Sequence, residues 1–245
     1  MEEKGMHITM KIYAEAEPAW LPKKQEGGGE EKYCIDLNGD ASRDEVDTLL
    51  RVLARYNDSY LDTGAKKDVF LRQMHRGLDR RDLTLPGGIR FEGDGCRIYP
   101  GCCCGVEQWV YIFGGLKEHQ SPWMGHNPDV SFLEKDGVCY IADTGLRRRS
   151  FGRVIRGEYG VRGKVGVEDA ICDKKIRIIG WPEQEFEVLL NRLAGEFEDF
   201  LNGPLQERME QLAGEWARQF VRAFARCFRR HNNIKMYSDS IRLIL

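Results

Sequence analysis

Short stretches in which apolar and polar residues alternate mark the expected strands of this chain. Residues 6–13 alternate in this way, and a second such stretch at residues 32–37 follows a loop with two prolines and three consecutive glycines. Two later pairs of stretches enclose turn sequences rich in Gly and Asp, which predicts hairpins at residues 89–99 and 130–141. A last strand is expected at residues 174–179. Because hairpins join antiparallel strands, we expect a mainly antiparallel sheet.

Helices are expected where apolar residues recur at every third or fourth position. The clearest begins after Ser42, which forms a capping box with Glu45 and precedes an apolar face that extends to Tyr56. Weaker patterns predict a helix over residues 65–78 and a short helix over residues 106–113, which should end at the pair Gly114-Gly115.

The longest helical pattern lies toward the end of the chain. Pro182 suits its first turn, and Asn202-Gly203-Pro204 is expected to end it and begin a second, antiparallel helix. The residues expected to be buried in this pair are Phe186, Leu190, Phe197, Trp216 and Phe220. The whole pattern predicts a single α+β domain over residues 1–245, with a mainly antiparallel sheet, helices on one face and a C-terminal helical hairpin at about residues 182–230.

Composition narrows the environment and the partners. The chain has 39 acidic and 37 basic side chains and a net charge of −2, so no overall field attracts nucleic acid or an anionic membrane. No stretch approaches the roughly 18 apolar residues of a membrane span, and the N-terminal residues lack the apolar run of an export signal. We therefore expect a cytoplasmic protein whose eight cysteines are reduced thiols, with no membrane or nucleic-acid partner.

Three successive cysteines between glycines, Gly101-Cys102-Cys103-Cys104-Gly105, form the most unusual motif. The motif fits a nucleophile elbow with Cys103 at its centre, because it lies between an expected strand and an expected helix whose dipole lowers a thiol pKa. His126 is then the candidate base. Against this enzyme stands the predicted topology, since a hydrolase elbow needs a doubly wound sheet and this chain has hairpins.

A metal or redox site is a second interpretation of the same region. Its candidate ligands are Cys96, Cys102, Cys104 and His126, which His119 and Cys139 could join if the two hairpins pack together. Zinc sites usually pair two cysteines separated by two residues, and the spacing here is one residue short. We expect no cofactor, with zinc as the alternative, and favour a structural role in which small thiol side chains fit a tight turn.

Two tryptophans near this motif are candidates for a binding surface. Trp109 and Trp123, with Glu107 and Asp129, could line it, although large aromatic residues beside Pro and Gly more often fill the core. A row of arginines also lies in the last helical stretch, and we interpret it as a solvated face near a helix end. The row consists of Arg218, Arg222, Arg226, Arg229 and Arg230.

The order of these motifs resembles a family of uncharacterised bacterial cytoplasmic proteins. The resemblance rests on PGCCCG-x-E-x-W, then SPW-x-GH-x-P, a hairpin, a strand and a long helix, and it covers about residues 85–205. It implies an immunity-like protein that binds and neutralises a partner. We therefore expect an interaction module whose partner is another protein, with a cysteine-dependent hydrolase or a metal or redox enzyme centred on Cys102 to Cys104 as the alternative.

Overall fold

The computed structural model describes most of the chain, which forms two compact units. The described residues are 9–16, 33–58, 61, 66–93, 96–100, 104–125, 130–143 and 176–229. Unit 1 comprises Met1–Met10, Arg90–Cys103 and Tyr111–Asn191, and unit 2 comprises Lys11–Ile89, Cys104–Val110 and Arg192–Leu245. Both units are therefore assembled from stretches that lie far apart in the sequence.

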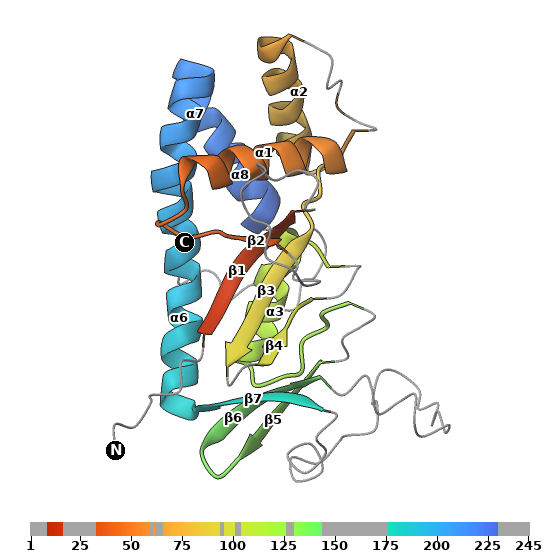
Figure 1. Cartoon of the computed structure of the whole chain (residues 1–245), viewed down its shortest axis with the longest axis vertical. Coiled ribbons are helices and arrows are strands. Elements are labelled where there is room, and N and C mark those ends of the chain that lie inside the picture. Colours follow the sequence, from red (N-terminus) through yellow and green to blue (C-terminus); the bar gives the residue numbers. More distant parts are fainter. Residues whose placement is uncertain are drawn as a thin grey trace, which may run out of the picture. The chain divides into compact units, whose positions relative to one another are not determined.

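Four strands form one sheet in the order β2-β1-β3-β4 (Figure 1). They are β1 (Thr9–Ala16), β2 (Tyr33–Asp36), β3 (Gly87–Gly93) and β4 (Cys96–Ile98). Antiparallel registers join β1 to β2 and β3 to β4, and the second pair confirms the hairpin predicted at residues 89–99. The expected first strand begins before the described residues, and β1 continues three residues beyond its predicted end.

Gly87 fixes how closely two parts of unit 2 approach each other. Its φ of 146° is unfavourable for a residue with a side chain, and a Cβ there would lie 2.1 Å from the carbonyl oxygen of Tyr13. Beside it, the Glu15 N–H donates to the Pro86 carbonyl at 2.9 Å. Glycine is therefore required where β1 passes the start of β3.

The first two helices follow the sequence pattern closely. α1 (Arg43–Tyr56) begins with the predicted capping box, in which the Glu45 N–H donates to Ser42 Oγ and the Ser42 N–H donates to the Glu45 carboxylate. α2 (Lys67–Arg80) occupies the second predicted helix. The buried side chain of Asn57 then donates to the carbonyls of Leu53 and Thr84, which joins the end of α1 to the chain that leads into β3.

The C-terminal helices differ from the prediction in the position of their turn. α6 (Glu183–Phe200) continues through a π-helical turn, η3 (Leu201–Leu205), directly into α7 (Gln206–Ala213), so the turn predicted at Asn202 to Pro204 is wrong. The wider π-turn accommodates Pro204, whose missing N–H would interrupt an α-helix. The chain reverses at Gly214, where φ is 57°, and passes through η4 (Gly214–Trp216) into α8 (Ala217–Arg229), which packs against α7 (Figure 1).

A second sheet of three strands lies in unit 1. Its strands β5 (Val130–Lys135), β6 (Val138–Asp143) and β7 (Arg177–Pro182) are antiparallel and lie in that order. The predicted hairpin turn is confirmed at Asp136 and Gly137, which both have positive φ. β7 continues through Pro182, where the prediction already began a helix. The antiparallel pairing of both sheets confirms the α+β class.

A short helical segment follows the cysteine motif. η2 (Val106–Gln108) leads into α3 (Trp109–Lys117), which passes the glycine pair that was predicted to end it. Each glycine inside a helix costs only about 1 kcal/mol relative to alanine, so packing of the buried residues of α3 can carry the helix past the pair. The chain leaves α3 instead at His119, where φ is 54°. Within the described part of the chain, no helix is both long enough and apolar enough to cross a membrane.

Candidate functional site

The centre of the predicted cysteine site lies outside the described residues. This applies to Cys102, Cys103, His126 and Asp129, so the nucleophile elbow and the metal or redox site centred on them stay predictions. Of the other candidate ligands, Cys104 is buried and Cys96 is half-buried. None of the five cysteines in the described ranges forms a disulfide bond.

Trp109 and Trp123 have different environments. Trp109 is buried, its indole N–H donates to the Phe228 carbonyl at 2.7 Å, and its ring lies 5.4 Å from that of Phe197. The prediction that it fills the core is confirmed. Trp123 is 37% exposed, so the same prediction is wrong for this residue. The neighbouring Met124 is buried and occupies the interior at this loop instead.

Glu107 is folded back over the turn that precedes η2. Its carboxylate lies 2.3 Å from where a Cβ of residue 105 would be, so Gly105 leaves the space that the carboxylate fills. Burial raises the pKa of Glu107, while the backbone N–H groups of Glu107 and Leu85 lower it. This position is typical of a structural carboxyl group that supports a turn, rather than of a residue on a binding surface.

His119 and Cys139 approach each other in unit 1 through a shared carboxylate. The Nδ1 of His119 pairs with Glu134, its Nε2 lies 3.5 Å from Glu187, and the Cys139 thiol lies 4.0 Å from the same Glu134 oxygen. Burial, followed by the charges of Glu134, Glu183 and Glu187, raises the pKa of Cys139 to about 11. The thiol is thus protonated near neutral pH and is a poor nucleophile.

The same geometry disfavours a metal centre at these residues. The two nitrogens of His119 face two separate carboxylates, so they do not converge on one ion. No group of three or more potential ligands with metal-binding geometry occurs among the residues that the structure describes. The structure therefore brings together two of the residues considered as ligands, His119 and Cys139, without forming a metal site.

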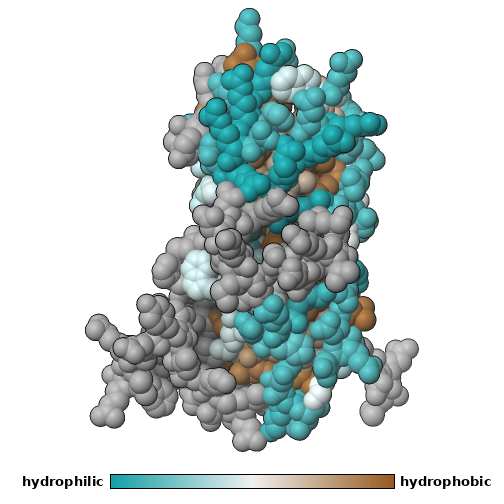
Figure 2. All heavy atoms as spheres, turned by 180° about the vertical axis from the view of Figure 1, so that it is seen from behind, coloured by the Kyte–Doolittle hydropathy of each residue, from teal (hydrophilic) through white to brown (hydrophobic). Residues whose placement is uncertain are grey.

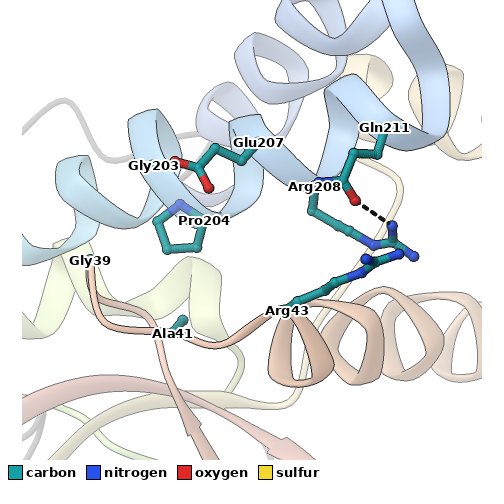
Figure 3. Close-up of a pocket in the computed structure, with 8 residues that line it drawn as sticks. All are labelled: Gly39, Ala41, Arg43, Gly203, Pro204, Glu207, Arg208 and Gln211. Carbon is teal, nitrogen blue, oxygen red and sulfur yellow. Dashed lines mark hydrogen bonds between the residues drawn. The ribbon is translucent and has the colours of Figure 1, made fainter.

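A cavity of about 210 Å³ lies between the loop before α1 and the π-turn with the start of α7 (Figure 3). Arg208 is the most constrained of its lining side chains, because it forms a two-point ion pair with Asp47 and donates to Gln211 at 2.9 Å. Figure 3 shows the guanidinium of Arg43 beside that of Arg208. Because the guanidinium of Arg208 already bonds Asp47 and Gln211, its main role is to attach α7 to α1. The lining residues are Gly39, Ala41, Arg43, Gly203, Pro204, Glu207, Arg208 and Gln211.

A more distinctive surface lies where α2 packs beside α8 in unit 2. Trp216 is 37% exposed, the guanidinium carbon of Arg72 lies 5.1 Å from its ring centroid, and the centroid of the His75 ring lies 5.7 Å away in a T-shaped arrangement. Further along the two helices, Arg226 pairs with Asp79. These two contacts place α2 and α8 side by side with the same chain direction.

We call this region the α2–α8 surface. Its members are Val69, Arg72, His75, Arg76 and Arg80 from α2, and Trp216, Arg218, Arg222 and Arg226 from η4 and α8. Figure 2 shows hydrophilic side chains gathered over the upper part of the molecule, where Figure 1 places α2, α7 and α8. Val69 is an exception, being apolar and 48% exposed.

The position of Trp216 corrects the sequence prediction. Its four-residue spacing from Leu212 and Phe220 predicted a buried residue on one continuous apolar stripe. The helix instead breaks at Gly214, and the 3-10 turn that follows changes the angular relation between the residues before and after it. As a result, Phe220 is buried and Trp216 lies at the surface.

The charge of the two helices contrasts with that of the whole chain. α2 and α8 together carry eight basic and two acidic residues, a net charge of +6, whereas the chain carries −2. Arginines recur at every fourth position, at 72, 76 and 80 on α2 and at 218, 222 and 226 on α8. Like charges at this spacing repel, and the four such pairs together destabilise the helices by about 1–2 kcal/mol. The dipole of α8 favours basic residues at its end, but it does not account for Arg218 in its first turn.

Only half of this surface follows from the sequence pattern. The row on α8 was recognised but interpreted as a solvated helix end, while the row on α2 and the exposure of Trp216 were missed. The repeated four-residue spacing of arginines within α2 was the available signal. No protein-family profile, curated protein or solved structure matches this chain.

Proposed function

We propose that this protein is an interaction module that binds a partner protein through the α2–α8 surface. The observation that carries the proposal is the exposed ring of Trp216, which lies between Arg72 and His75. Tryptophan and arginine are the residues most enriched among those that dominate the free energy of protein association. An exposed tryptophan with an arginine over its ring therefore supports a docking role.

The surroundings of Trp216 also favour tight binding on physical grounds. Arg72 lies over the ring and His75 forms a T-shaped contact with it, so the side chain is oriented before a partner arrives. A preoriented side chain loses less conformational entropy on association, which leaves more of the contact energy for affinity. Val69 adds an exposed apolar side chain on the same helix as Arg72 and His75.

The resemblance to immunity-like proteins supports the same class of function, because such a protein acts by binding a partner and needs no chemistry of its own. The described thiols give little support to the alternative enzyme. Burial raises the pKa of Cys139 to about 11 and that of Cys227 to about 12, and Cys104 is buried. An enzyme at Cys102 and Cys103 would have to rely on residues outside the described ranges.

A paired capture experiment tests the proposal. Immobilised wild-type protein, Trp216→Ala and Tyr56→Ala are each exposed to a lysate of the source organism, and the retained proteins are identified by mass spectrometry. Tyr56 is the matched control, because it is an exposed aromatic residue that lies on α1. We expect a partner retained by the wild type and by Tyr56→Ala, but lost with Trp216→Ala.

The captured partner is then purified, and its affinity for each variant is measured by calorimetry. Loss of binding counts only if Trp216→Ala keeps the circular dichroism spectrum of the wild type. Equal affinity of the partner for the wild type and Trp216→Ala would refute docking at this surface.

A further inference from the structure

We infer that the α2–α8 surface receives an acidic helix of the partner protein, which presents carboxylates along one face to the two arginine rows. This inference rests on the proposed function, since it names the chemistry of the segment that docks there. It depends on the arginines rather than on Trp216, so the two proposals can fail separately.

The arginine rows hold uncompensated charge. Arg226 pairs with Asp79 and Arg72 lies over Trp216. The other members of the rows have no carboxylate partner in the described part of the chain, and these are Arg76, Arg80, Arg218 and Arg222. Four exposed guanidinium groups that form no ion pair with the described residues, on two adjacent helices, form a local positive field that attracts carboxylates.

The spacing of the rows matches that of a helical ligand. Residues four apart on a helix are separated by about 6 Å along its axis. Carboxylates at every fourth position of a partner helix have the same separation, so each could reach an arginine of one row. Contacts from Trp216 to Arg72 at one end and from Arg226 to Asp79 at the other hold the two rows alongside each other. The partner helix can thus engage both rows at once.

A nucleic acid fits this surface less well than an acidic protein. The net charge of the whole chain is −2, so the attraction of anions is confined to the local field of α2 and α8, which matches a short acidic helix better than a long nucleic acid. Stacking of a base would need an open face of Trp216, and Arg72 already covers one face of that ring. Val69 adds an exposed apolar side chain that a protein ligand can cover.

Fluorescence anisotropy with defined probes tests the inference. The first probe is a labelled helical peptide of about 20 residues with glutamate at every fourth position of one face and leucines beside them. The second has glutamine in place of each glutamate, and the third is a labelled single-stranded oligonucleotide of thymidine. We expect the glutamate peptide to bind best, with affinity that falls severalfold as salt rises and screens the charges.

Charge reversal then locates the binding site. The double variant Arg76→Glu/Arg222→Glu should bind the glutamate peptide at least about tenfold more weakly, because attraction becomes repulsion in both rows. The matched control is Arg43→Glu/Arg51→Glu, which makes the same charge change at two exposed positions of α1 and should reduce affinity much less. Circular dichroism confirms that both variants are folded.

Each remaining outcome overturns the inference. Equal binding of the glutamate and glutamine peptides, or no binding of either, would exclude the acidic helix, while a partner captured through Trp216 would still support the proposed function. Tighter binding of the oligonucleotide would indicate a nucleic-acid ligand. Equal losses in the two double variants would show a general charge effect instead of a site on α2 and α8.

Discussion

Replacing Trp109 by phenylalanine and by alanine separates the two ways in which this residue stabilises unit 2. Its indole N–H donates to the carbonyl of Phe228, in the last turn of α8, where carbonyls lack partners within the helix. Trp109→Phe keeps much of the ring packing against Phe197 but leaves this buried carbonyl unpaired. An unpaired buried polar group costs about 1–3 kcal/mol, so we expect a loss of that size.

Trp109→Ala removes the packing as well as the hydrogen bond. Truncation of a buried tryptophan costs about 3–5 kcal/mol, and Trp109 is only 6% exposed. The free energy of unfolding is measured from urea transitions followed by circular dichroism, and the slope of each transition is compared with that of the wild type. Trp123→Ala is the matched control, because its ring is 37% exposed and we expect a loss of at most about 1 kcal/mol.

Two results would refute this reasoning. If Trp109→Ala costs no more than Trp123→Ala, Trp109 does not fill the core. If Trp109→Phe is as stable as the wild type while Trp109→Ala is not, the bond to the Phe228 carbonyl contributes nothing and packing alone accounts for the effect.

Three further predictions concern stability. Burial raises the pKa of the Cys227 thiol from 9.0 to about 12, so the unfolded chain loses this proton first as pH rises above 9. Between pH 8 and about 10, the free energy of unfolding should therefore fall by about 1 kcal/mol more in the wild type than in Cys227→Ala. Gly87→Ala should cost several kcal/mol, because its Cβ would meet the Tyr13 carbonyl, whereas Gly195→Ala in open space on α6 should stabilise by about 0.5–1 kcal/mol in the same urea assay. Arg222→Gln removes two like-charge contacts on α8 and should raise the thermal midpoint slightly, and a lower midpoint would contradict the repulsion.

The predictable part of the fold consists of features that depend on neighbouring residues. The capping box at Ser42 and the hairpin turn at Asp136 and Gly137 involve interactions within four residues, and both appear as predicted. The buried stripe of α6 follows for the same reason, since one helix keeps a constant angular repeat. These features confirm the α+β class without any knowledge of tertiary contacts.

The features that were predicted wrongly depend on choices between local signals or on distant contacts. Pro204 and Gly214 both suggest the end of a helix, and only the second ends one, because a π-turn absorbs the proline. Because the helix ends at Gly214 and not at Pro204, Trp216 lies at the surface and not in the core, where it was expected. The pairing of the rows through Arg72 and Arg226 requires α2 to pack beside α8, and residues this far apart give no common sequence pattern.

The late position of α8 has a consequence for synthesis of the chain. This helix packs against α2, supplies the carbonyl that binds Trp109, and adds Phe224, whose ring lies 6.3 Å from that of Phe200. A nascent chain emerges from the ribosome in sequence order, so Trp109 and Phe200 cannot make their contacts with α8 until that helix has been translated. Chains released at Gly214 would keep this apolar surface exposed and become substrates for chaperones and proteases.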